Sequence, residues 1–142
     1  MSEGALEKTR EFWERAFNGR ELSALDALIA DGYVNHAALP GTPPGPEGQA
    51  QLMERIWAAF PDAHFTIEHL ALDGDTVICI GTMDGTHDGE LLGMPPSGRR
   101  VRWRQCHVVR VDGEGRALEH RAIRDDAGLF RQMLGESDPQ SA

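Results

Sequence analysis

The sequence predicts an α+β fold in which a curved antiparallel sheet wraps around three amino-terminal helices, forming a cone with a deep pocket. Apolar residues recur at helical spacing as far as Phe60, and from His64 the period falls to two. Helical and strand segments are therefore segregated along the chain, which indicates α+β rather than a parallel α/β fold. At 142 residues we expect one domain, 1–142, with its core at about 5–134 and a flexible tail at 136–142.

The first sixty residues predict three helices. Residues 4–18 and 21–30 carry apolar stripes, and Asn18-Gly19 and Gly32 are the stop signals. Pro46 at a first helical position opens the third helix, which Pro61 ends. Residues 33–36 are expected to form only a strand stub or turn, and residues 37–45 a surface loop rich in Pro and Gly.

Four strands and a last helical turn are predicted after His64. In the first strand the apolar parity slips near Glu68 and His69, which predicts a β-bulge. Asp73-Gly74-Asp75 is a hairpin turn signal before a strand at 76–84. A long connection at 85–98 leads to two more strands, joined by a Gly-rich turn at 112–115. A short helix is expected at 129–134.

Composition excludes several classes of function. The net charge of −9 argues against nucleic-acid binding, which needs a basic surface. No charged and apolar leader opens the chain and no apolar run approaches ~18 residues, so we expect a cytoplasmic protein without a membrane partner. Cys79 and Cys106 are expected to be reduced core thiols.

The strand after residue 100 has one unusual face. Strict alternation places valines and polar residues together, as in the lining of a half-polar cavity. The six residues on this face are Val101, Trp103, Gln105, His107, Val109 and Val111. On the returning strand, the same count places Glu119, Arg121, Ile123 and Asp125 on one face.

The length of the intervening turn decides which residues of the two strands share the pocket. A three-residue loop with Gly115 in the left-handed region is favoured. It would place His107 opposite Arg121, Gln105 opposite Ile123, and Trp103 opposite Asp125. A two-residue or four-residue turn would instead bring His120 and Arg124 to the side of His107.

Two residues of this hairpin are the candidate catalytic groups. His107 titrates near neutrality and could act as an acid or base, or could be a structural histidine between strands. Asp125 could be a general base with a raised pKa, or could cap the last helix, a role that Asp126 could also fill.

Further candidates surround this pair. Arg121 could neutralise Asp125 or bind an anionic substrate, or could pair with Glu119 or Glu68. Tyr33, Asn35 and His36 precede the Pro-rich loop, at the expected cavity mouth. The remaining candidate substrate-binding residues are Gln105, Trp103, Phe12 and Trp13. No HExxH, CxxC or other metal-ligand pattern occurs, so we expect neither a metal site nor a cofactor.

Three motifs carry a resemblance to a known family: Phe60-Pro61-Asp62, GTHxGxxxGxPPxGR beginning at Gly85, and DxxGLxxQ beginning at Asp125. Together they resemble the SnoaL-like polyketide cyclases and ester cyclases of the nuclear transport factor 2-like superfamily. The resemblance implies a pocketed α+β cone and a homodimer or higher oligomer. It also implies cofactor-free ring closure by intramolecular aldol condensation of a small-molecule substrate.

The resemblance also implies roles for particular residues. The family's aspartate, which removes a proton α to a carbonyl, corresponds to Asp125, and Gln105 and His107 correspond to its assisting polar groups. The chain departs from the family at Arg121, where tryptophan is usual, and in the turn at 112–116, which is one residue longer than usual.

The leading hypothesis is therefore a cofactor-free cyclase or isomerase in which Asp125 takes the proton and His107 and Gln105 polarise the carbonyl. One alternative is a hydrolase resembling limonene-type epoxide hydrolases, built from Tyr33, Asn35, Asp125 and Arg121. The other is a binding protein that uses the same pocket without catalysis.

Overall fold

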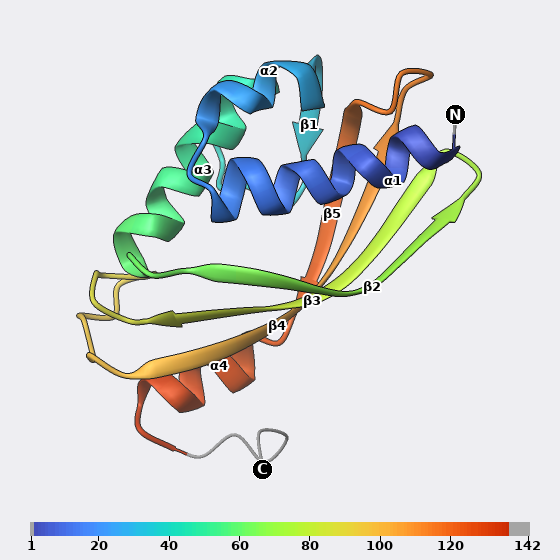
Figure 1. The fold of residues 1–142 in the computed structure, drawn as a ribbon. Coiled ribbons are helices and arrows are strands. Elements are labelled where there is room, and N and C mark those ends of the chain that lie inside the picture. The colour runs from blue at the N-terminus through green and yellow to red at the C-terminus, as the bar shows by residue number, and fades with distance from the viewer. Residues whose placement is uncertain (1, 137–142) are drawn as a thin grey trace.

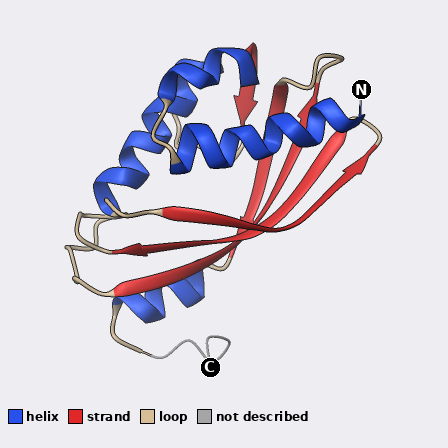
Figure 2. Cartoon of the chain, in the orientation of Figure 1, coloured by secondary structure: helices blue, strands red, loops and turns tan. Residues whose placement is uncertain are grey.

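The computed structural model describes residues 2–136 of the chain. Five strands form one curved, open sheet, with α1 to α3 over one side of it and α4 on the other (Figure 1). The same view coloured by secondary structure shows the amino-terminal helices on one side of the sheet and a further helix, near the carboxyl terminus, on the other side (Figure 2). The predicted α+β class is confirmed. Residues 137–142 of the predicted tail lie outside the described residues.

The amino-terminal helices follow the predicted pattern with two changes. α1 (Ser2–Glu11) runs directly into a π-helical segment, η1 (Phe12–Asn18). The Asn18 side chain then accepts from the backbone N–H of Phe65 and donates to its carbonyl, which fixes the helix end against the sheet. The second predicted helix is shorter, comprising η2 (Leu22–Ala24) and α2 (Leu25–Leu28). α3 (Gly45–Ala59) begins one residue before Pro46.

The second helix ends early because Ile29 already has extended dihedral angles and opens a strand, β1 (Ile29–Asn35). The expectation of only a stub or turn at residues 33–36 is therefore wrong. β1 lies at the edge of the sheet and pairs in parallel with β5 (Ala117–Arg124). All other pairings between the described strands are antiparallel.

The remaining strands are β2 (His64–Asp73), β3 (Thr76–Thr86) and β4 (Arg100–Val111), in the spatial order β1-β5-β4-β3-β2. The β2–β3 register shifts between Ile67 and His69, so the bulge predicted from the apolar parity is confirmed. Cys79 pairs with His107, and Cys106 pairs with the next residue of β3, Ile80. Cys79 therefore faces the core and Cys106 the opposite side of the sheet. Both are free thiols.

The connection between β3 and β4 is held against the end of α3. The backbone N–H groups of Asp88 and Gly89 both donate to the Ala59 carbonyl at 3.0 Å. A Cβ at Gly89 would lie 2.0 Å from the Ala58 carbonyl oxygen, so only glycine fits this close approach. α4 (Asp126–Met133) follows β5 and packs on the outer side of β4.

Candidate active site

A pocket lies between the amino-terminal helices and the inner face of the sheet, with about 900 Å³ of empty space when the open solvent at its mouth is included. Mainly apolar side chains from η1 and α3 form one wall together with Lys8 and Thr9 of α1, and β4 and β5 contribute to the other. The inner face predicted for β4 is confirmed. Its buried members are Val101, Trp103, Gln105, His107 and Val111, and Val109 is half-buried.

The turn between β4 and β5 has the predicted form. Gly115 has a φ of 84°, and its N–H donates to the Asp112 carbonyl at 3.0 Å. The Asp112 N–H donates to the Arg116 carbonyl at 2.9 Å, so three residues, 113–115, form the loop.

The register beyond that turn differs from the prediction because the ladder contains a bulge. Val111 pairs with Ala117, but Arg110 pairs with Glu119, so Leu118 is an extra residue on β5. A one-residue slip turns every later side chain to the other face. His107 consequently pairs with Ala122 rather than Arg121, and the predicted pairing is wrong.

The bulge brings His120 and Arg124 into the pocket. From the sequence, we expected His120 and Arg124 beside His107 only if the turn had two or four residues. Gln49, from α3, and Lys8 and Thr9, from α1, are further polar residues of the lining, and no signal in the sequence singled them out.

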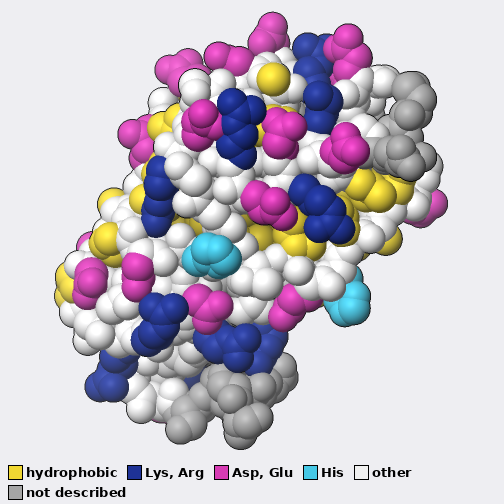
Figure 3. All heavy atoms as spheres, viewed as in Figure 1, with side chains coloured by type: hydrophobic (Ala, Val, Ile, Leu, Met, Phe, Trp, Pro, Cys, Tyr) yellow, Lys and Arg dark blue, Asp and Glu magenta, His cyan; other side chains and the backbone are white. Residues whose placement is uncertain are grey.

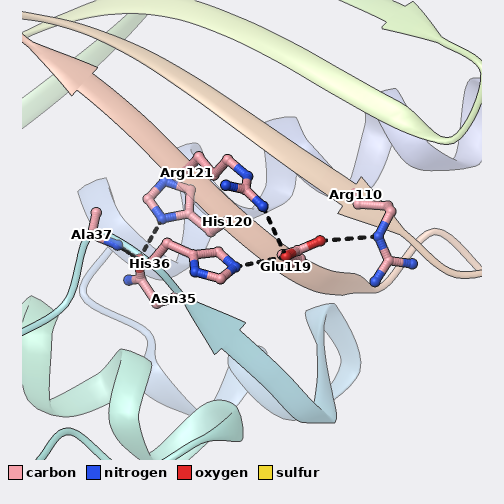
Figure 4. A network of polar contacts seen from close by, with 7 residues as sticks. All are labelled: Asn35, His36, Ala37, Arg110, Glu119, His120 and Arg121. Atoms are coloured by element: carbon pink, nitrogen blue, oxygen red, sulfur yellow. Dashed lines mark hydrogen bonds and ion pairs between the residues drawn. The ribbon is translucent and has the colours of Figure 1, made fainter. Parts of the chain in front are cut away.

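Arg121 lies on the outer face of β5, where its guanidinium donates to Glu119 Oε2 at 3.2 Å. Glu119 also accepts from His36 at 2.6 Å and from Arg110 at 3.2 Å, as Figure 4 shows. The hydrogen bond from His36 is the main reason that the pKa of the Glu119 carboxyl is lowered. Arg121 and His36 thus belong to a network on the protein surface. Pairing of Arg121 with Glu119 was the alternative to a role for Arg121 in the pocket.

Asp125 follows the end of β5 and is the N-cap of α4. Its carboxylate accepts from the Gly128 N–H at 2.9 Å and lies 3.9 Å from the Arg104 guanidinium. Asp125 is not among the described residues that line the pocket, whereas His107 is. The structure therefore does not bring the two predicted catalytic residues together in the pocket. Asp126 instead accepts from the indole N–H of Trp103 at 3.0 Å.

A chain of three side-chain contacts runs through the polar wall of the pocket. Asn35 Oδ1 lies 2.7 Å from His120 Nδ1, and His120 Nε2 lies 2.8 Å from His107 Nδ1. His107 Nε2 then lies 2.6 Å from Gln105 Oε1. Both imidazole rings are buried. We call His107 and His120 the histidine dyad.

The orientation of this chain is fixed at one end by the backbone. The Ala37 N–H donates to Asn35 Oδ1 at 2.9 Å, so this amide atom is an acceptor and His120 Nδ1 must carry a proton (Figure 4). At the other end Gln105 Oε1 faces His107 Nε2, and no further contact with a described residue fixes this amide. In this orientation of the amide, Oε1 is an acceptor. Three hydrogen bonds between two acceptors need three N–H protons, whereas two neutral imidazoles supply two. The arrangement therefore has room for one additional proton.

Burial opposes that additional proton. Desolvation, followed by the positive charges of His120 and Arg124, lowers the pKa of His107 well below its usual value. Desolvation also lowers the pKa of His120, to about 3, and Arg124 and His36 contribute in the same direction. At neutral pH the dyad is uncharged, and a proton placed on it is readily given up.

The other predicted lining residues lie around the dyad. Trp13 stacks on Phe65 with ring centroids 3.8 Å apart, and its ring lies 4.8 Å from that of His107. Phe12 and Trp103 complete the aromatic wall. The Tyr33 hydroxyl lines the pocket and donates to Gln49 Oε1 at 3.0 Å.

Asn35 lies behind His120 and lines a neighbouring cavity that also reaches Tyr33 and Gln49. Because Arg121 and Asp125 lie outside the main pocket, the four residues of the epoxide-hydrolase-like set do not assemble there. The described residues contain no cluster of three or more His, Cys, Asp or Glu side chains that could hold a metal ion.

Comparison with known families identifies the fold. The family model of SnoaL-like polyketide cyclases matches residues 7–133, nearly the whole length of the chain. The chain belongs to the SnoaL-like polyketide cyclase family. Nogalonic acid methyl ester cyclase of Streptomyces nogalater is 33% identical over 121 residues, covering 83% of this chain and 89% of the relative. Aklanonic acid methyl ester cyclase DauD of Streptomyces sp. strain C5 is 33% identical over 127 residues, covering 87% of this chain and 78% of DauD.

Solved structures of other proteins share this architecture. TsrD from Streptomyces laurentii superimposes with a TM-score of 0.85 at 25% identity, covering 94% of this chain and 96% of TsrD. Wild-type IdmH from Streptomyces antibioticus gives a TM-score of 0.74 at 31% identity, covering 92% of this chain and 96% of IdmH. Among the described residues, no helix is both long and apolar enough to cross a membrane.

Proposed function

We propose that this SnoaL-like chain is a cyclase that closes a ring in a carbonyl compound by acid/base chemistry, with the histidine dyad as the base. The observation that carries the proposal is the chain from Asn35 to Gln105, which has three hydrogen-bond positions and two protons. Such an arrangement can accept one proton and return it, which is what general acid–base catalysis requires.

The proposed reaction begins at His107 Nε2. When both rings are neutral, two nitrogens of the dyad carry no proton: His120 Nε2 accepts from His107 Nδ1, whereas His107 Nε2 receives no hydrogen bond. This nitrogen removes a proton α to a carbonyl, and the electrons of the C–H bond form an enolate. The enolate carbon attacks a second carbonyl of the same molecule, forming the new C–C bond. The resulting alkoxide takes the proton back from His107, so atoms and charge balance.

Gln105 lies next to the proposed base. Its Oε1 faces the lone pair of His107 Nε2 at 2.6 Å, so the Gln105 side chain rotates aside when the substrate C–H reaches that nitrogen. Its amide nitrogen makes no hydrogen bond to any described residue and belongs to a pocket-lining side chain. It is therefore available to donate to the substrate carbonyl as the enolate develops.

The test is turnover by the purified protein of nogalonic and aklanonic acid methyl esters and of the corresponding free acids, followed by chromatography and mass spectrometry. His107→Gln is expected to lower kcat/KM by about 10²–10⁴-fold, the usual contribution of a placed base. His69→Gln is the matched control, because His69 is exposed on β2, away from the pocket.

Equal turnover by His107→Gln and the wild type would exclude the dyad as the base. Saturable binding of these compounds without turnover would instead support the alternative of a binding protein. A homodimer, a cytoplasmic location and independence from cofactors are further predictions, which size-exclusion chromatography, cell fractionation and assays in chelator address.

A further inference from the structure

The charge of the pocket is opposite in sign to that of the molecule. The chain carries a net charge of −9, and on the face seen in Figure 3 acidic side chains are spread over the surface with basic ones between them. Among the described residues, in contrast, the pocket lining includes Lys8 and Arg124 and no Asp or Glu. An excess of cations in a mainly apolar cavity indicates that the cavity receives an anion.

Arg124 is the cation placed for this role. Its guanidinium lies over the Trp103 ring, 5.7 Å from the centroid, and forms no hydrogen bond or ion pair with any described residue. The carboxylate that acts on it electrostatically is that of Asp126, which accepts a hydrogen bond from the Trp103 indole N–H. Burial lowers the pKa of Arg124, a cost that a bound anion would offset.

The surface arginines of the same strands behave differently. Arg102, Arg110 and Arg121 each pair with a carboxylate on the outer face. Arg124 is thus set apart by its inward position and by its five unused donors, which match a carboxylate in a bidentate geometry.

From this arrangement we propose that the pocket binds carbonyl compounds that carry a free carboxylate, with Arg124 as the carboxylate-binding residue. The methyl ester cyclases among the relatives act, by their names, on compounds whose acid group is esterified. The inference rests on the proposed function only in calling the bound acid a substrate; binding itself needs no turnover.

A bound carboxylate would also act on the dyad. The charge of Arg124 is one of the causes that lower the pKa values of His107 and His120. Neutralising that charge raises both values and makes the dyad a stronger base only once the acid is in place.

The test compares anthraquinone-2-carboxylate with its methyl ester, titrated against the intrinsic fluorescence of Trp13 and Trp103 in the pocket. The wild type is expected to bind the acid about 10-fold more tightly, as one charge-assisted pair provides. Arg124→Gln should remove this preference while the affinity for the ester changes less than about twofold. Arg124→Lys, which keeps the charge but loses the bidentate fork, should retain part of it.

Arg102→Gln is the matched control, since it removes an arginine of β4 from the outer face and should leave the ratio of affinities intact. A wild type that binds the ester as tightly as the acid overturns the inference, and so does an acid preference that survives in Arg124→Gln. If Arg124→Gln does not fold, an unchanged preference in Arg124→Lys overturns it. Acid preference without turnover of any substrate refutes the proposed function and leaves this inference standing.

Discussion

His107 and His120 lie side by side in the pocket with ring planes 21° apart and with Nδ1 of the first 2.8 Å from Nε2 of the second. They come from adjacent strands and are joined in one hydrogen-bonded unit, so the two rings share protons and titrate as a pair. The pair is held between Asn35 and Gln105, and its behaviour as a unit leads to two pH-dependent predictions.

The first concerns activity. Because the pKa values of both histidines are lowered, the dyad stays unprotonated well below pH 6.5, the usual histidine range. We expect kcat/KM to be flat from pH 8 to pH 6 and to fall only at more acidic pH. In Arg124→Gln the loss of a nearby positive charge raises both pKa values, so the acidic fall should move to higher pH. A fall in kcat/KM centred near pH 6.5 in both the wild type and Arg124→Gln would contradict the assignment of the histidine dyad as the base.

The second prediction concerns stability. In the unfolded chain His120 takes up a proton near pH 6.5, whereas in the folded protein it does so near pH 3. Between these values the unfolded state binds more protons, so the free energy of unfolding falls as the pH is lowered, by up to about 1.4 kcal/mol per pH unit.

Urea denaturation at pH 7, 6 and 5 measures this slope. It should be reduced in His120→Gln and retained in His64→Gln, a matched change of an exposed histidine at the start of β2. Equal slopes in His120→Gln and the wild type would show that His120 is not the source.

A third prediction separates the two roles considered for Asp125. As the N-cap of α4, it should lower the free energy of unfolding by about 1 kcal/mol when changed to Ala, because the Gly128 N–H loses its acceptor. Asp125→Ser keeps a capping oxygen and should recover most of this loss. Loss of turnover in Asp125→Asn, with unchanged stability, would instead support the catalytic role that the sequence predicted.

A fourth prediction tests the anchoring of the β3–β4 connection on α3. Gly89→Ala forces a Cβ into the Ala58 carbonyl and should destabilise the fold by about 1–3 kcal/mol in thermal or urea denaturation. Gly113→Ala is the control, since its Cβ would have no neighbour within 4 Å. Equal free energies of unfolding for the two variants would mean that the β3–β4 connection moves away from α3 without destabilising the fold.

The two bulges explain why the sequence predicted the fold better than the site. In β2, strongly apolar residues on both sides of Glu68 reveal the change of phase, because only one parity can face the core. In β5 the apolar pattern points the wrong way. Ile123 is 76% exposed, whereas the polar His120 is buried, so alternation alone could not place the bulge at Leu118.

Other differences have local causes. The sequence does not predict the full length of β1, because Asp31 and Gly32 interrupt its apolar residues. Pairing with β5 stabilises the strand although its own β-propensity is low. Either Asp125 or Asp126 could cap α4 from sequence, and the backbone geometry after Arg124 decides for the first. The inward face of β4, in contrast, was predictable throughout, because six alternating positions left no ambiguity of phase.

The extra residue at Leu118 has a consequence for how such pockets diverge. A substitution changes one side chain of a lining, but an insertion or deletion at this position interchanges the two sides of the strand that follows. Arg121 and Arg124 would then exchange places with respect to the cavity, along with their neighbours. A single codon gained or lost is thus a genetic route by which a SnoaL-like protein can acquire a differently charged cavity while its helices and the rest of its sheet stay unaltered.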